Sequence, residues 1–233
     1  MSSICESLFT AAHQCREQHE KFNVWLAYLN LENTFAENPE EAASALLQRA
    51  LQYNDAKKMY LAAITTFHLT NREELLATCL KAMCRKFGSS CKVWLKAFEQ
   101  AIAAGKDPKS VIERATNALP TRKHVKFLSR AALFELKSGA QERGRAMFES
   151  LLRTYPKRVD LWGVYIDQEI KIGAQASIRN LFERTIHLQL PAKKMQFFFK
   201  RYVAYEAAHG TAETVAYVKK QAMQYIDNLK SAV

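Results

Sequence analysis

Large apolar residues recur along the chain at a spacing that is much longer than one helical turn. The recurring positions lie 35, 34, 34, 34 and 37 residues apart: Trp25, Tyr60, Trp94, Leu128, Trp162 and Phe199. Each begins a segment whose apolar residues follow one face of a helix, as in Trp162, Tyr165 and Ile166. A fixed period near 34 residues is typical of a repeat protein, in which each unit stacks on its neighbours.

Helix-breaking residues divide each period into two helices. One series consists of residues that tolerate a left-handed helix end: Asn38, Asn71, Gly105, Gly139, Gly173 and Gly210. A second series of breaks falls between them: Asn54-Asp55, Gly88, Pro120, Pro156 and Pro191. Two breaks in each period leave two helices of about 12–16 residues, which is an ordinary helix length.

The pattern therefore predicts an all-α fold, a right-handed superhelical solenoid of antiparallel helix pairs. We expect residues 1–22 to form a half repeat with a single helix, residues 23–228 to form six helix pairs in one solenoid, and residues 229–233 to form a tail. The chain has only 7 glycines and 5 prolines, too few for the many tight turns of an all-β protein. No helix of this kind buries its apolar face alone, so stacking creates one elongated core.

The second helix of each pair has a motif of its own. Arg145, Phe148 and Glu149 recur 34 positions later as an identical set of residue types. The arginine and the glutamate of this motif are i, i+4 neighbours, and we expect them to pair on the surface of their own helix. The glutamates that close the first-helix motif, Glu169 and Glu206, are expected to bond to a neighbouring helix.

These two motifs together resemble a known repeat. Trp162-x-x-Tyr165-x-x-x-Glu169, followed by Phe182-Glu183-Arg184, resembles the half-a-TPR (HAT) repeat, a tetratricopeptide-like unit of RNA-processing proteins. Longer segments, in which details outside the repeat motif match along with the repeat frame, extend the resemblance to the C-terminal repeat module of the ribosomal RNA processing protein 5 family: residues 24–33, 50–55, 119–125, 155–162 and 193–202. The resemblance covers about residues 20–228.

The resemblance implies a non-catalytic scaffold of ribosome biogenesis in the nucleus and nucleolus. Such a module docks into the early pre-ribosome, the small-subunit processome, and supports pre-rRNA processing by contacting assembly factors and, directly or indirectly, pre-rRNA. Long family members carry S1-type RNA-binding domains before the module, and this sequence contains none, so it represents either a fragment or a separate subunit. Two alternatives stay open: a HAT-repeat scaffold of pre-mRNA splicing or 3′-end cleavage, and a direct RNA-binding protein.

Charge adds a candidate binding surface. The formal net charge is +11, and residues 117–233 hold 20 lysines and arginines against 10 acidic residues. A field of this sign attracts polyanions or acidic protein surfaces. The candidate binding residues lie in, or within two turns of, the breaks that precede first helices: Lys57, Lys58, Arg122, Lys123, Lys126, Lys157, Arg158, Lys193, Lys194, Lys200 and Arg201.

These basic residues have two interpretations. Their spacing would align them along one edge of the stack, where they could contact several phosphates or an acidic partner. Alternatively, they serve the C-terminal end of the preceding helix, where positive charge is favourable.

The sequence offers no pattern that predicts catalysis. It contains no P-loop, no dinucleotide-binding glycine cluster, no HExxH motif and no nucleophile elbow. The acidic residues do not cluster as a magnesium site requires, so we expect no catalytic residue, metal, cofactor or small-molecule substrate. No run of about 18 apolar residues occurs, so we expect no membrane partner.

Overall fold

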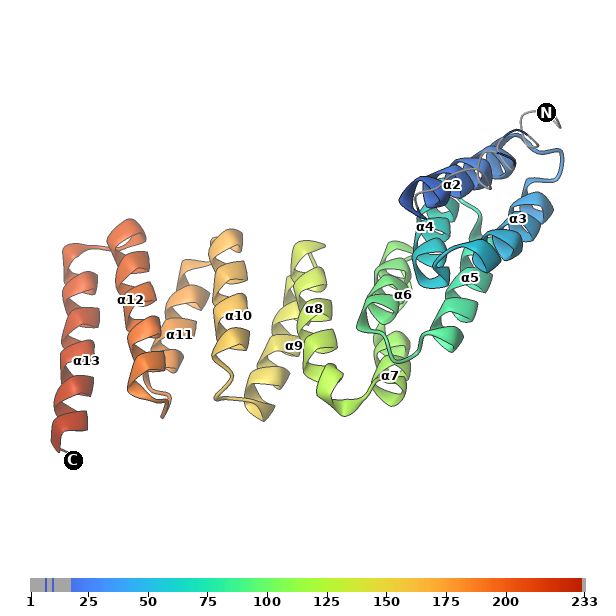
Figure 1. Cartoon of the computed structure of the whole chain (residues 1–233). Helices are drawn as coiled ribbons and strands as arrows, with labels where there is room; N and C mark the ends of the chain where they lie inside the picture. The colour runs from blue at the N-terminus through green and yellow to red at the C-terminus, as the bar shows by residue number, and fades with distance from the viewer. Residues whose placement is uncertain (1–6, 8–9, 11–17, 232–233) are drawn as a thin grey trace. The chain divides into compact units, whose positions relative to one another are not determined.

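The computed structural model describes residues 7, 10 and 18–231, and these residues are helical apart from short turns (Figure 1). The helices in chain order are α2 (Gln18–Phe35), α3 (Pro39–Tyr53), α4 (Ala56–Leu69), α5 (Glu73–Lys86), α6 (Cys91–Ala103), α7 (Lys109–Ala118), the short 3-10 helix η1 (Thr121–Lys123), α8 (His124–Lys137), α9 (Gln141–Thr154), α10 (Val159–Ile172), α11 (Gln175–Ile186), α12 (Ala192–His209) and α13 (Ala212–Ser231). Helices adjacent in sequence pack on one another, as α4 does on α5 and α12 does on α13. The predicted all-α fold of stacked helix pairs is confirmed.

The chain forms two compact units, residues 1–127 and residues 128–233, called here the N-terminal and C-terminal units. In the N-terminal unit α3 and α4 both pack on α2, and α6 packs on α5 and α7. In the C-terminal unit α10 packs on α9 and α11, and α12 packs on α11 and α13. Each unit is thus a stack in sequence order, and the predicted division of the chain into one six-pair solenoid stays a prediction.

The ends of the predicted solenoid differ in detail from the helices observed. Helix α2 begins at Gln18, so residues 18–22 lie in the first helix of the first pair instead of in the half repeat, most of which falls outside the described residues. No glycine or proline separates residues 18–22 from the rest of α2, so nothing ends a helix there. Helix α13 continues to Ser231, so residues 229–231 are helical and not part of a tail.

The helix ends confirm four of the six predicted left-handed positions. Asn71, Gly105, Gly139 and Gly173 have φ values of 55°, 65°, 91° and 84°. The prediction is wrong for Asn38, which is the N-cap of α3 with φ of −117°, and for Gly210, with φ of −110°. Gly210 serves close packing instead, because a Cβ atom there would lie 2.1 Å from the Oε2 atom of Glu206.

The recurring apolar positions lie in the cores of the two units. Trp25, Trp94 and Trp162 are at most 4% exposed, whereas Leu128 is half-buried. The indole N–H of Trp94 donates to the carbonyl oxygen of Gly88 at 2.7 Å, and that of Trp162 donates to the carbonyl of Pro156 at 2.9 Å. Each of these two tryptophans therefore ties the first helix of a pair to the break that precedes it.

Aromatic stacking joins successive pairs in the C-terminal unit. Phe148 on α9 stacks on Tyr165 of α10, with ring centroids 4.8 Å apart and ring planes 4° apart. Phe182 on α11 stacks on Tyr202 of α12 with nearly the same geometry, 4.7 Å and 5°. Because each stack links the second helix of one pair to the first helix of the next, the repeat interface itself is repeated.

Replacement of Trp162 by alanine should lower the free energy of unfolding by about 3–5 kcal/mol, because it leaves a cavity at a buried position. Trp162→Phe keeps an aromatic ring but loses the hydrogen bond to Pro156, so we expect a smaller loss, roughly 1–2 kcal/mol. Urea denaturation followed by circular dichroism measures both values. A loss below about 1 kcal/mol for Trp162→Ala would contradict a core role for this side chain.

Candidate functional site

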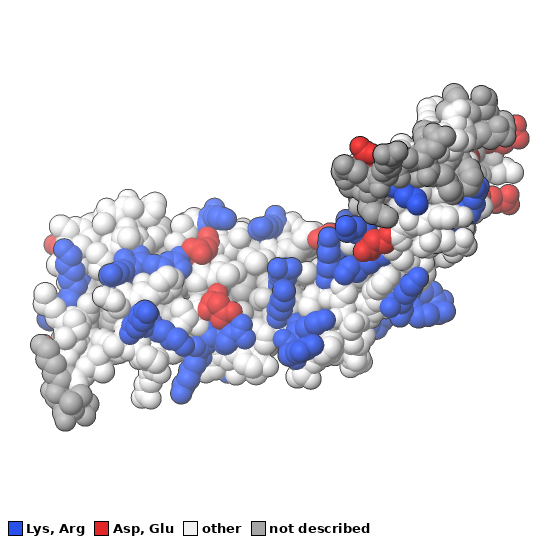
Figure 2. Space-filling view, viewed as in Figure 1, with Lys and Arg blue, Asp and Glu red and all other residues white. Residues whose placement is uncertain are grey.

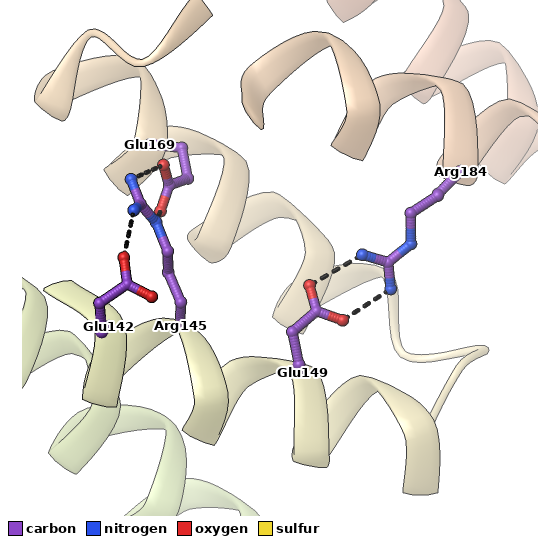
Figure 3. Close-up of polar contacts among 5 residues, drawn as sticks. All are labelled: Glu142, Arg145, Glu149, Glu169 and Arg184. Atoms are coloured by element: carbon purple, nitrogen blue, oxygen red, sulfur yellow. Dashed lines mark hydrogen bonds and ion pairs between the residues drawn. The ribbon is translucent and has the colours of Figure 1, made fainter. Parts of the chain in front are cut away.

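Two buried carboxylates on first helices of the C-terminal unit bind arginines of the preceding helix, and Figure 3 shows the first of these pairs. Glu169 on α10 has no exposed surface and accepts hydrogen bonds from the Nε and Nη2 atoms of Arg145 on α9, both at 2.9 Å. Glu206 on α12 is 1% exposed and accepts the equivalent bonds from Arg179 on α11, at 2.8 and 3.2 Å. Two parallel bonds fix the relative orientation of guanidinium and carboxylate, and so of the two helices.

A second ion pair joins α9 to α11. Both carboxylate oxygens of Glu149 accept hydrogen bonds from Arg184, at 2.8 Å each, as Figure 3 shows. The Arg184 guanidinium also lies over the ring of Trp162, 5.0 Å from its centroid. In the next repeat, Glu183 instead accepts hydrogen bonds from the hydroxyls of Tyr202 and Tyr217, at 2.7 and 3.2 Å.

The predicted i, i+4 pairing of arginine and glutamate within one helix is therefore wrong. Arg145 binds Glu169 instead of Glu149, and Arg179 binds Glu206 in place of the glutamate four positions after it. The physical reason is burial: an i, i+4 pair on the surface gains only a few tenths of a kcal/mol. It would also leave a buried carboxylate without a partner, at a cost of about 3–5 kcal/mol.

An arginine partner favours the charged form of the Glu206 carboxyl. The hydrogen bond from Arg179 lowers the pKa of the Glu206 carboxyl, against the opposing effect of burial. The hydrogen bond to Glu169 raises the pKa of Arg145. On the surface, Arg158 likewise lowers the pKa of Asp160, mainly through a side-chain hydrogen bond. The charges within each pair therefore cancel at neutral pH.

Arginines and lysines have different roles in the C-terminal unit. Further ion pairs join Glu135 to Arg143, Glu142 to Arg145, Asp160 to Arg158, and Asp167 to Arg201. Among the described side chains of this unit, no lysine forms an ion pair with a carboxylate. On the face shown in Figure 2, lysines and arginines outnumber acidic residues over α8 to α12. The uncompensated positive charge of this surface therefore comes largely from lysines.

Four of the predicted binding residues lie at one edge of the C-terminal unit and are called here the basic edge: Lys157, Arg158, Lys193 and Lys194. They lie in the α9–α10 turn and in the first turn of α12, and these two segments occur at the same edge of the stack (Figure 1). Arg158 is held by Asp160 at 2.6 and 2.8 Å. The three lysines are exposed and form no ion pair with the described residues, so they are available to a partner.

The other two candidates of this unit lie on α12. Lys200 is exposed. Arg201 forms an ion pair with Asp167 on α10, and its guanidinium lies over the ring of Phe197, 5.5 Å from the centroid. Arg201 is therefore engaged between two repeats, and Lys200 is the more accessible of the two.

The remaining candidates belong to the N-terminal unit and occur in two places. Lys57 and Lys58 lie in the first turn of α4, where the Lys58 backbone N–H donates to the Asp55 carboxylate at 2.9 Å. Arg122 and Lys123 form part of η1, and Lys126 is exposed on α8. The Lys123 ammonium donates to the backbone carbonyl of Ser89, in the turn that precedes α6.

The structure also contains a groove that the sequence analysis missed. It has a volume of about 730 Å³ and lies in the C-terminal unit. Its lining residues come from α9, α11, the two turns that follow these helices, and Trp162 of α10: Glu149, Leu152, Arg153, Pro156, Trp162, Asn180, Glu183, Arg184, His187 and Leu188. The signal in the sequence is faint: Glu149 and Arg153 recur in phase as Glu183 and His187, 34 positions later.

Comparison with known proteins identifies the family of the chain. A family model described as the C-terminal HAT repeat of the pre-mRNA-splicing factor Syf1/CRNKL1 matches residues 16–232. The chain belongs to the HAT-repeat family. It spans the tandem helix pairs that define this class of fold, as the sequence motifs predict.

The HAT-repeat chain is also similar to proteins that are named for RRP5 and rRNA biogenesis. It is 46% identical over 214 residues to the rRNA biogenesis protein RRP5 of Arabidopsis thaliana. It is 40% identical over 220 residues to the RRP5 homolog of Mus musculus, and 35% identical over 218 residues to rrp5 of Schizosaccharomyces pombe. The alignments cover 91%, 94% and 93% of this chain but only 11%, 12% and 13% of those relatives. The resemblance predicted from the sequence is confirmed.

Removal of the guanidinium from the buried pair should destabilise the stack. Arg145→Ala leaves the Glu169 carboxylate buried and unpaired, so we expect a loss of about 3–5 kcal/mol in the free energy of unfolding. Replacement of both residues by methionine should cost much less, because no buried charge remains. Arg130→Ala is the control, since Arg130 is an exposed arginine on α8 that forms no ion pair with the described residues. Urea denaturation measures all three, and equal losses for the single and double variants would exclude unpaired charge as the cause.

The Glu206 carboxyl should make stability depend on pH. Its pKa is lower in the folded chain than the unfolded value of about 4.3. Its contribution is therefore fully present above that value and is lost as the pH falls through the folded pKa. Glu206→Gln removes this titration, so the stability of the variant should fall less steeply than that of the parent between about pH 5 and pH 3. Thermal unfolding across this range measures both slopes, and parallel curves would contradict the prediction.

Proposed function

We propose that this chain is a non-catalytic scaffold of ribosome biogenesis. It docks into the early pre-ribosome, the small-subunit processome, and supports pre-rRNA processing in the nucleolus. The observation that carries this proposal is the similarity, over more than nine-tenths of the chain, to proteins named for RRP5 and rRNA biogenesis. The chain spans about an eighth of the length of these relatives, so it corresponds to one module of these longer proteins.

The physical mechanism of such a scaffold is a long preformed surface. Stacked helix pairs are already ordered, so a partner that engages several repeats loses little free energy to ordering the scaffold. Several weak contacts along such a surface add by avidity. Among the described residues, no helix is long and apolar enough to cross a membrane. On the basis of the similarity to RRP5 proteins, we propose pre-ribosomal assembly factors and pre-rRNA as partners, and we propose no membrane partner and no small-molecule substrate.

A second candidate function is a scaffold of pre-mRNA maturation. The observation that favours it is the description of the matching family model, which names a pre-mRNA-splicing factor. A shared repeat fold is weak support for a shared process, because one fold serves many functions. The identity of 35–46% to RRP5 proteins over more than nine-tenths of the chain supports ribosome biogenesis more strongly.

Affinity purification of the tagged chain from the cells that express it tests the assignment. Mass spectrometry and RNA sequencing of the bound material should recover small-subunit assembly factors and rRNA precursors, and a fluorescent fusion should accumulate in the nucleolus. Recovery of splicing or polyadenylation factors without rRNA precursors would move the chain to pre-mRNA maturation.

The lysines of the basic edge should contribute to particle association. Lys157→Glu with Lys193→Glu should reduce the recovery of rRNA precursors roughly tenfold, because lost contacts to phosphate or acidic partners are replaced by repulsion. Lys137→Glu with Lys171→Glu is a matched control. Both residues are exposed lysines of the same unit, near the ends of α8 and α10 and so at the opposite edge of the stack. Circular dichroism should be unchanged in both double variants.

The two pairs of reversals separate three outcomes. Reduced recovery of rRNA precursors in the basic-edge variant alone supports a localised binding surface. Equal loss in both variants would indicate a dependence on total charge. Unchanged recovery in both would exclude the basic edge. Binding of naked RNA by the purified chain, with a steep decrease as salt is raised, would favour direct RNA contact through these lysines.

A further inference from the structure

We propose that the groove between α9 and α11 binds an acidic peptide segment of a partner protein. An apolar side chain of the peptide enters the groove, and flanking carboxylates pair with Arg153 and with the lysines of the basic edge. The proposal rests on the proposed function as a scaffold that holds other proteins, and it names the chemistry of one binding site.

The groove and the basic edge are continuous. The groove lining includes Pro156 and Leu188, which lie in the turns after α9 and α11. Pro156 immediately precedes Lys157, and Leu188 precedes Lys193 by five positions. A chain segment that leaves the groove at this end therefore meets the lysines within a few residues.

The charges around the groove favour an acidic occupant. Glu149 is already neutralised by Arg184, and Glu183 already accepts two tyrosine hydroxyls. Arg153 is exposed and forms no ion pair with the described residues, like the three lysines of the basic edge. Unpaired positive charge at Arg153 and at the lysines of the basic edge thus adjoins a groove in which Arg184 cancels the charge of Glu149, and such a field favours a negatively charged ligand at that end.

The lining of the groove favours a peptide over a nucleic acid. Pro156 is exposed and Leu188 is half-buried, so both provide apolar surface that phosphates and riboses do not use, whereas an aliphatic or aromatic anchor would bury there. Trp162 is 2% exposed beneath the Arg184 guanidinium, so its ring is not available to stack on a base. Asn180 is exposed and forms no hydrogen bond with the described residues, so its amide is free to bind a peptide backbone.

The first experiment measures peptide binding to the purified full chain by fluorescence anisotropy. The probe is a short fluorescein-labelled peptide with a central leucine–phenylalanine pair between runs of aspartate and glutamate. We expect saturable binding, and we expect Arg153→Glu to weaken it by at least about tenfold through charge repulsion. Arg130→Glu, the same reversal at an exposed arginine of α8, should leave the affinity unchanged. No saturable binding of the probe, or equal weakening by the two variants, would overturn the proposal.

Two further probes test whether the groove requires an apolar side chain and whether it prefers peptide to RNA. Replacement of the leucine–phenylalanine pair by serines should weaken binding by at least about tenfold, because the groove then buries no apolar side chain. Equal affinity of the serine peptide would show simple attraction between charges and overturn the groove as the site. Single-stranded oligouridine of the same net charge should not displace the peptide. Its displacement of the peptide at a lower concentration than unlabelled peptide would assign the groove to RNA instead.

Failure of this proposal is distinguishable from failure of the proposed function. Peptide binding to the purified chain does not depend on ribosomal components. If the peptide binds but purification from cells recovers no pre-ribosomal factors, the groove stands and the assignment to ribosome biogenesis fails. If pre-ribosomal factors are recovered but the probe does not bind, only the groove fails.

Discussion

The buried carboxylate of Glu169 requires the guanidinium of Arg145, and this requirement fixes how α10 sits on α9. A carboxylate without exposed surface costs several kcal/mol unless a partner and hydrogen bonds satisfy it. Two bonds of 2.9 Å admit only a narrow range of helix orientations. The pair between Glu206 and Arg179 imposes the same constraint one repeat later. Because apolar replacements of such pairs are often as stable, we infer that these pairs act mainly on the register of the helices. That register places both the lysine-bearing turns and the walls of the groove.

The different roles of arginine and lysine follow from the need of the buried carboxylates for a bidentate partner. The planar guanidinium suits a bidentate bond to a buried carboxylate, whereas the lysine ammonium is strongly hydrated and flexible. In the C-terminal unit most of the acidic side chains form ion pairs with arginines, and the lysines are left exposed to water. Net charge alone would count both kinds of cation equally. In this unit the lysines, together with Arg130 and Arg153, are the cations that form no ion pair with the described residues and are available to hold a partner.

The sequence predicts well whatever depends on neighbours along the chain. The alternation of helices and breaks, the burial of Trp94 and Trp162, and the left-handed ends at Gly105 and Gly173 all follow from local periodicity and backbone preference. The same reasoning fails where the partner is distant. Helical spacing predicts a glutamate four positions away as the partner of Arg145, whereas the partner in the structure is Glu169, which is 24 positions away and becomes adjacent only when the next pair stacks.

The candidate site was predictable in part for the same reason. The basic edge consists of residues adjacent in sequence to the breaks, so its lysines could be assigned from spacing alone. The groove requires two second helices side by side, and no local pattern marks it. Gly210 illustrates a third case, since its backbone is set by the approach of the Glu206 carboxylate and not by the need for a left-handed turn.

The repeats share one pattern of helices, but the interfaces between successive repeats differ in their side-chain contacts. The charge of the groove depends on these differences. Between α9 and α11, Arg184 forms an ion pair with Glu149 and lies over the ring of Trp162. The charge of Glu149 is therefore cancelled, and the indole ring is shielded from a ligand. At the next interface the corresponding carboxylate, Glu183, binds two tyrosine hydroxyls, and no arginine of the described chain reaches it. A neutral hydroxyl satisfies the hydrogen bonds of a carboxylate without cancelling its charge. The attraction for an acidic ligand is therefore strongest where Glu149 is cancelled, at the end of the groove that adjoins Arg153 and Lys157.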